Sequence, residues 1–301
     1  ALNANTGTIT NAVTFSNTGA LTLGTSGGTL AFTGGITATA PSGITLSGTI
    51  TAAGTGVLNL GAPVAVTANT TVGGTSTGNI TLGAATLVDG ATLTVGTGIA
   101  NAISLSTVTG TASGTASNLT INTTGAVTVG GAIGTDIGTI TITNSGGTTF
   151  SGTVAATTVT LTNTTGSIIF NDALTATTLG TAAQAYNLQL NGSSGTITNA
   201  VTFSNAGALA LGASGGTLTF NGGLTAIAPS ASTLKGTIIS SNDAMSFGPI
   251  TLGADTTLNT VATTNVADLS IGAVTGATYN LSLRTGAVSG AEITGTSTSG
   301  V

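Results

Sequence analysis

The sequence predicts an all-β protein, a parallel β-helix (β-solenoid) with coils of about 20 residues. Three observations predict this fold. The chain contains a long internal repeat, it consists of short alternating apolar runs bounded by turn residues, and it lacks the residue types that build helices and large aromatic cores. Such features are typical of proteins in which small units stack on one another.

The internal repeat relates residues 7–50 to residues 195–238 at a constant offset of 188, without a gap and with ten differences in 44 positions. The segment Leu21-Thr22-Leu23 becomes Leu209-Ala210-Leu211. Successive side chains of a strand point to opposite faces. The conserved outer positions of this triplet are therefore expected to face a core, and the changed middle position is expected to face outward.

The same reasoning gives a buried set and an exposed set. We expect burial of Ile9, Val13, Phe15, Leu21, Leu23, Leu30 and Phe32, and of Ile197, Val201, Phe203, Leu209, Leu211, Leu218 and Phe220. We expect exposure of Thr22 and Ala210, and we interpret the change of Ser47 to Lys235 as a surface change. The change of Ile44 to Ser232 does not fit the pattern.

Short alternating runs continue along the whole chain, each bounded by Gly, Asn, Ser or Asp, as strands and turns require. The clearest are 13–15, 21–23, 58–60, 80–82, 93–95, 119–121, 127–129, 140–142, 159–161, 188–190 and 281–283. Glycines that end such runs give the unit length, as from Gly61 to Gly83 and from Gly253 to Gly272. Residues 1–301 are therefore interpreted as one continuous solenoid segment.

Tandem immunoglobulin-like β-sandwiches are the alternative fold, because 188 is twice 94, the size of such a domain. Sandwich cores are usually anchored by large aromatic residues. This chain has seven Phe, two Tyr and no Trp, which favours the thin apolar layers of a solenoid.

Charge is nearly absent, at 3% of residues with a net charge of −5. A nucleic-acid partner would require a basic patch, and membrane insertion would require an apolar run of about 18–20 residues. Neither is present in the sequence, so we expect neither partner.

No catalytic, cofactor-binding or metal-ligating residue is predicted. The chain has no His and no Cys, and its acids are scattered. Asp243 and Asp255 could approach each other on neighbouring coils, but turn residues that bond their own backbone are the favoured interpretation. We therefore expect that the protein is not an enzyme and carries no cofactor.

Threonine triplets suggest one further function, ice binding by a regular Thr ladder. Thr-x-Thr occurs at 8–10, 92–94, 139–141 and 158–160, without a fixed coil spacing, which favours ordinary outward-facing strand residues. Tyr186 and Tyr279 each precede an Asn-Leu-x-Leu strand and are interpreted as structural rather than as sugar-stacking residues.

The segments 19–24, 28–32, 79–83 and 118–121 resemble the strand repeats of filamentous-haemagglutinin-like and autotransporter-like bacterial surface adhesins. The resemblance covers the whole chain and is mostly compositional. It implies a right-handed parallel β-helix, export to the cell surface, and attachment or matrix formation. The secretion domain and outer-membrane barrel of that family are not visible in the sequence.

We therefore expect a structural segment of an extracellular fibre or adhesin, located at the cell surface. Its expected partner is itself, by head-to-tail stacking or by continuation in a longer chain, with lateral association through Thr-rich faces. The alternatives are a host- or surface-binding adhesin stalk and an ice-binding or polysaccharide-acting β-helix.

Overall fold

The computed structural model describes residues 1–276 and 278–299, and none of these residues lies in a helix. Their strands pair in parallel, each coil with the next, which makes the fold a parallel β-solenoid. The antiparallel sandwich is excluded for the described residues. Among them there is also no helix long and apolar enough to span a membrane. The chain divides into two compact units, residues 1–156 with 163–166 and residues 157–162 with 167–301.

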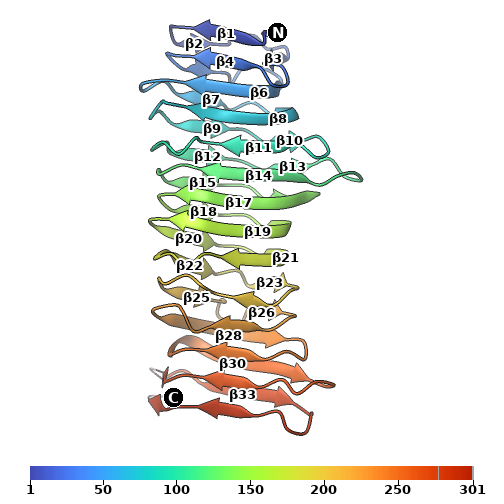
Figure 1. Cartoon of the computed structure of the whole chain (residues 1–301), viewed down its shortest axis with the longest axis vertical. Coiled ribbons are helices and arrows are strands. Elements are labelled where there is room, and N and C mark those ends of the chain that lie inside the picture. Colours follow the sequence, from blue (N-terminus) through green and yellow to red (C-terminus); the bar gives the residue numbers. More distant parts are fainter. Residues whose placement is uncertain (277, 300–301) are drawn as a thin grey trace. The chain divides into compact units, whose positions relative to one another are not determined.

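Three columns of strands form the first unit (Figure 1). The first column holds β1 (Thr6–Ile9), β4 (Thr29–Phe32), β6 (Ile44–Ala52), β8 (Val64–Gly74), β11 (Thr92–Val95), β14 (Ser117–Asn122) and β17 (Ile137–Ser145). The second holds β2 (Val13–Thr14), β5 (Ile36–Thr37), β7 (Leu58–Leu60), β9 (Ile80–Leu82), β12 (Ile103–Leu105), β15 (Val127–Val129) and β18 (Thr148–Phe150). The third holds β3 (Leu21–Leu23), the first halves of β6 and β8, β10 (Ala85–Leu87), β13 (Val108–Gly110) and β16 (Ile133–Gly134). The residues of β19 (Val154–Thr164) are divided between the two units.

The second unit also has three columns. The first holds β21 (Leu174–Thr181), β23 (Ser194–Ile197), β26 (Thr217–Phe220), the second half of β28 (Ser232–Ser240), β30 (Ile250–Ala262) and β33 (Leu281–Gly286). The second holds β24 (Val201–Thr202), β27 (Leu224–Ala226), β29 (Met245–Phe247), β31 (Leu269–Ile271) and β34 (Ile293–Gly295). The third holds β20 (Ser167–Phe170), β22 (Asn187–Leu190), β25 (Leu209–Leu211), the first halves of β28 and β30, β32 (Val274–Thr275) and β35 (Thr298–Ser299).

The strand register fixes the coil length. The shortest step between paired residues runs from Ser232 to Ile250, and the longest runs from Thr92 to Asn118. The other ladders lie between these limits, so the expected coil of about 20 residues is confirmed as an approximate figure for irregular coils.

Apolar side chains stack inside each unit because every second residue of a strand points inward. In the first unit Leu23, Leu46, Val66 and Leu87 follow one another in register, and each is fully buried. Such a ladder needs only a thin layer of aliphatic residues in each coil, which explains how a chain with so few aromatic residues forms a continuous core.

The two copies of the repeat share one backbone. Strands β1 to β6 return as β23 to β28 at the same offset of 188, apart from one additional residue at the end of β27. The register is shared too, since Leu21 pairs with Ile44 and Leu209 pairs with Ser232. Ser232 is buried like Ile44, and its next neighbour in the ladder is Ile250 where the first copy has the smaller Val64.

Burial of the first coil differs from the expectation. Ile9, Val13 and Phe15 are only half-buried, whereas their counterparts Ile197, Val201 and Phe203 are buried. In the described structure the first coil has a neighbouring coil on one side only, so its inward residues are covered by other side chains from that side alone. The remaining eight members of the buried set are buried as expected, and Thr22 and Ala210 are half-buried rather than exposed.

Candidate functional site

Two acidic side chains bond the backbone of the following coil. Asp255 Oδ1 accepts hydrogen bonds from the Asn280 backbone N–H at 2.9 Å and side-chain amide at 3.3 Å. Asp268 Oδ1 accepts the N–H of Glu292 at 2.9 Å. Within the described residues no three His, Cys, Asp or Glu side chains gather as a metal site would require. The turn interpretation is wrong for Asp255, because this residue lies within β30 and its side chain bonds the following coil rather than its own backbone.

Asparagine side chains do the same from one coil to the next. The Oδ1 atoms of Asn69, Asn118 and Asn187 accept the backbone N–H groups of Thr92, Thr139 and Ala208 at 2.8–2.9 Å. Each partner lies one coil later in the chain. These side chains are held by the backbone and so present fixed positions on the surface.

Polar residues also occupy one interior corner of the first unit. The Ser76 hydroxyl donates to the Gly56 carbonyl at 2.6 Å, the Asn101 amide to the Ser76 carbonyl at 2.6 Å, and the Thr123 hydroxyl to the Asn101 carbonyl at 2.6 Å. All three side chains are buried. They satisfy carbonyl groups that would otherwise be buried without a partner, and therefore belong to the core rather than to a site.

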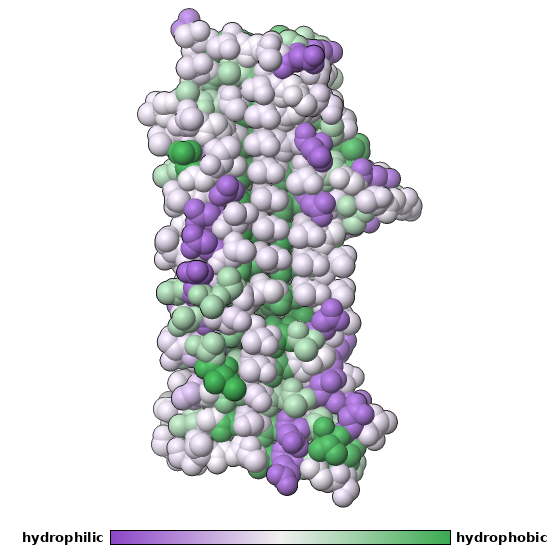
Figure 2. Space-filling model, viewed as in Figure 1, coloured by the Kyte–Doolittle hydropathy of each residue, from purple (hydrophilic) through white to green (hydrophobic). Residues whose placement is uncertain are grey.

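A threonine ladder runs along the outer surface of the first column in the first unit. One threonine of each strand pairs in register with the threonine of the next strand: Thr29, Thr49, Thr71, Thr94, Thr120 and Thr141. A parallel row beside it holds Asn69, Thr92, Asn118 and Thr139. Figure 2 shows this face as rows of residues of intermediate hydropathy that run along the stack.

The triplets are outward-facing residues, as expected, and some of them align from coil to coil. The steps of the ladder differ in length, and the step from Thr94 to Thr120 is longer than the step from Thr29 to Thr49, so no fixed spacing reveals the ladder in the sequence. The Thr-x-Thr triplets 92–94 and 139–141 contribute to the ladder. In two other coils asparagine stands in place of the first threonine of the triplet, at Asn69 and Asn118.

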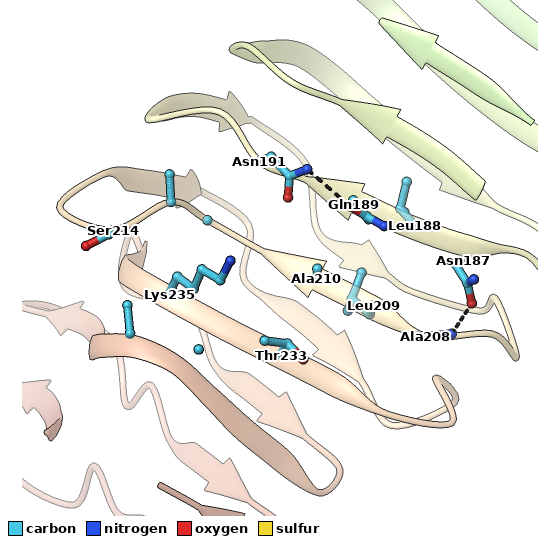
Figure 3. Close-up of a pocket in the computed structure, with 14 residues that line it drawn as sticks. Asn187, Leu188, Gln189, Asn191, Ala208, Leu209, Ala210, Ser214, Thr233 and Lys235 are labelled. Carbon is cyan, nitrogen blue, oxygen red and sulfur yellow. Dashed lines mark hydrogen bonds between the residues drawn. The ribbon is translucent and has the colours of Figure 1, made fainter. Parts of the chain in front are cut away.

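A groove of about 540 Å³ lies on the third column of the second unit, over β22, β25, β28 and β30 (Figure 3). Its polar lining includes Asn191, Gln189, Thr233, Ser214 and Lys235. The Asn191 amide donates to Gln189 Oε1 at 3.2 Å. Lys235 is one of only two basic residues in the chain, and no acidic residue lines the groove. The sequence analysis did not identify this site, although the change from Ser47 to Lys235 between the copies was its signal.

Tyr186 is fully buried, and its hydroxyl donates to the Leu161 carbonyl at 3.4 Å. Burial raises the pKa of Tyr186 to about 12. Its interior position agrees with the structural role expected for it. Tyr279 is 39% exposed, so the interpretation as a structural residue is less well supported there.

The fold and these surfaces define a parallel β-solenoid with a threonine-lined face on the first unit and a polar groove on the second. No family model, no curated protein and no solved structure matches the chain. The compositional resemblance to surface adhesins therefore stays an expectation.

Proposed function

We propose that this chain is a structural segment of an extracellular fibre or adhesin that extends by stacking coil on coil. The in-register stacking of one coil on the next carries this proposal. A preceding coil buries the inward residues of the next one: Ile197, Val201 and Phe203 lie beneath such a coil and are buried, whereas the identical Ile9, Val13 and Phe15 have none among the described residues and are half-buried. A coil with its apolar residues and backbone edge uncovered is a template for another coil.

The covering coil can come from preceding residues of a longer chain or from a second copy of this chain. Both arrangements are head-to-tail and open, so they extend into a fibre rather than close into a ring. The uncharged threonine face supports lateral association in the same way, because no like charges oppose the approach of two copies.

We expect the purified 301-residue chain to self-associate at micromolar concentration, with a sedimentation coefficient that rises with concentration. Phe15→Lys places a charge on the open end and should keep the chain monomeric. Val57→Lys is the control, because Val57 is 40% exposed at the side of a coil and should leave association unchanged. A stable, dispersed monomer of the unmodified chain would contradict stacking between copies.

Ice binding is the second candidate function, supported by the threonine ladder. Its hydroxyl and methyl groups repeat at the strand spacing of roughly 4.8 Å, which suits a periodic surface of ordered water. We expect slowed ice recrystallisation, lost in Thr94→Lys at the middle of the ladder and kept in Thr128→Lys on the second column. Equal activity of both variants, or none in the unmodified chain, would rule out this function.

A further inference from the structure

The groove over β22, β25, β28 and β30 has a built-in place for one cationic side chain. Asn191, Gly212, Lys235 and Gly253 directly follow Leu190, Leu211, Leu234 and Leu252, which pair in register. Lys235 therefore lies between two glycines. A Cβ atom at Gly253 would come within 2.7 Å of Lys235 Cε and 3.1 Å of its Cγ, so the lysine stem occupies the space that Gly253 leaves open.

In the first copy of the repeat, two short polar side chains occupy the same position. Ser47 stands in place of Lys235, and Thr67, which follows Val66 as Gly253 follows Leu252, stands in place of the glycine. The Ser47 and Thr67 hydroxyls hydrogen-bond to each other at 2.7 Å. The hydrogen-bonded pair Ser47 and Thr67 of the first copy is thus replaced in the second copy by Lys235 and by a glycine that leaves room for its side chain.

Lys235 has no ion-pair partner among the residues that the structure describes. Asn191 lies two coils away along the same row, roughly 10 Å at the usual strand spacing. Next to it, the amide nitrogen of Gln189 makes no hydrogen bond to any described residue, while Gln189 Oε1 is held by Asn191. Figure 3 shows these groups on one side of the sheet, with Lys235 extended along the groove.

We propose that this groove binds an acidic oligosaccharide, with a sugar carboxylate on the Lys235 ammonium group and sugar hydroxyls on the Gln189 and Asn191 amides. Side-chain amides both donate and accept hydrogen bonds, as hydroxyl groups do. The groove volume of about 540 Å³ lies within the range of small-molecule sites and exceeds what a simple ion fills.

Other anions fit the groove less well. A nucleic acid is held by several cations along its phosphates, and this groove offers one. A peptide strand binds by adding to a free sheet edge, whereas the backbone groups of β25 and β28 are already paired on both sides. The proposal does not depend on the fibre function, because the groove lies on the side of the coils and not at the open end.

The test is a binding titration at low ionic strength with a tetramer of a uronic acid and, as the uncharged probe, the same tetramer with its carboxyl groups reduced to alcohols. We expect saturable binding of the acidic tetramer only. Lys235→Ser, the residue of the first copy, should weaken it about tenfold to a hundredfold, as the loss of one charge-assisted hydrogen bond does. Lys235→Arg should retain most of the affinity, and Gly253→Thr should weaken it without any change in charge.

A double variant provides the sharpest control. Lys235→Ser combined with Ser47→Lys moves the lysine to the other copy and leaves composition and net charge unchanged. We expect it to bind as weakly as Lys235→Ser, with an unchanged thermal melt in both single variants of Lys235. Full binding by the double variant, equal binding of the reduced tetramer, or complete competition by acetate at the tetramer's own concentration would overturn the proposal.

Discussion

Phe203→Asp is expected to unfold the coils around it. Phe203 is fully buried and packs edge-to-face on Phe220, with ring centroids 5.9 Å apart. Removing a buried ring costs about 3–5 kcal/mol, and an unpaired carboxylate in its place adds the penalty of burying a charge. Hydrogen exchange should show lost protection in β24 and β27, and the free energy of unfolding should fall by at least the cost of the ring.

Phe15→Asp is the matched control, because the same residue lies in the same local sequence of the other copy. Phe15 is only half-buried in the first coil, so the new carboxylate keeps contact with water. The fall in the free energy of unfolding should therefore be clearly smaller than for Phe203→Asp. Thr22→Asp, on the outer side of β3, should do little in a dispersed chain. Equal losses for Phe203→Asp and Phe15→Asp would show that position in the stack does not decide burial.

The fold could be predicted from the sequence because its determinants are local. Leu21 and Leu23 flank a variable residue, and this alternation is enough to identify a strand and its inner face. The repeat at offset 188 shows that the units stack, and the strands of the second copy return at that offset.

Burial at the first coil could not be predicted in the same way, because it depends on the neighbours and not on the residue. Ile9 and Ile197 lie in identical local sequences, yet only the second is buried. The alternation gives the direction of a side chain, whereas its cover comes from the adjacent coil.

The threonine ladder and the groove could not be predicted from the sequence for a related reason. Thr94 and Thr120 are far apart in the sequence but adjacent in the ladder, and the long loop between β13 and β14, residues 111–116, takes up the extra length of this coil. The groove depends on which residue lies one coil beyond Lys235, and Gly253 could not be assigned to that place without the register. The alternation of residues within a strand is visible in the sequence whatever the lengths of the loops. The alignment of residues between coils depends on those lengths.

Gly236→Ala is expected to be strongly destabilising although it adds a single methyl group. Gly236 lies where β28 passes from the third column to the first, and its φ is +68°. An added Cβ would overlap with the Ala213 carbonyl oxygen and would lie 2.6 Å from that of Gly216. The loss should therefore exceed the roughly 1–2 kcal/mol that a left-handed conformation costs an L-residue, since the backbone of the adjacent coil must move.

Gly215→Ala separates the two causes, because Gly215 has a similar φ of +73° but nothing within 4 Å of the added Cβ. Gly215→Ala should show the conformational cost alone. The difference between the two variants in the free energy of unfolding, measured with denaturant, therefore gives the cost of the contact between coils. Gly48 and Gly27 repeat the comparison in the first copy, at φ of +73° and +75°. Similar losses for Gly236→Ala and Gly215→Ala would mean that backbone conformation, and not contact between coils, requires glycine at this corner.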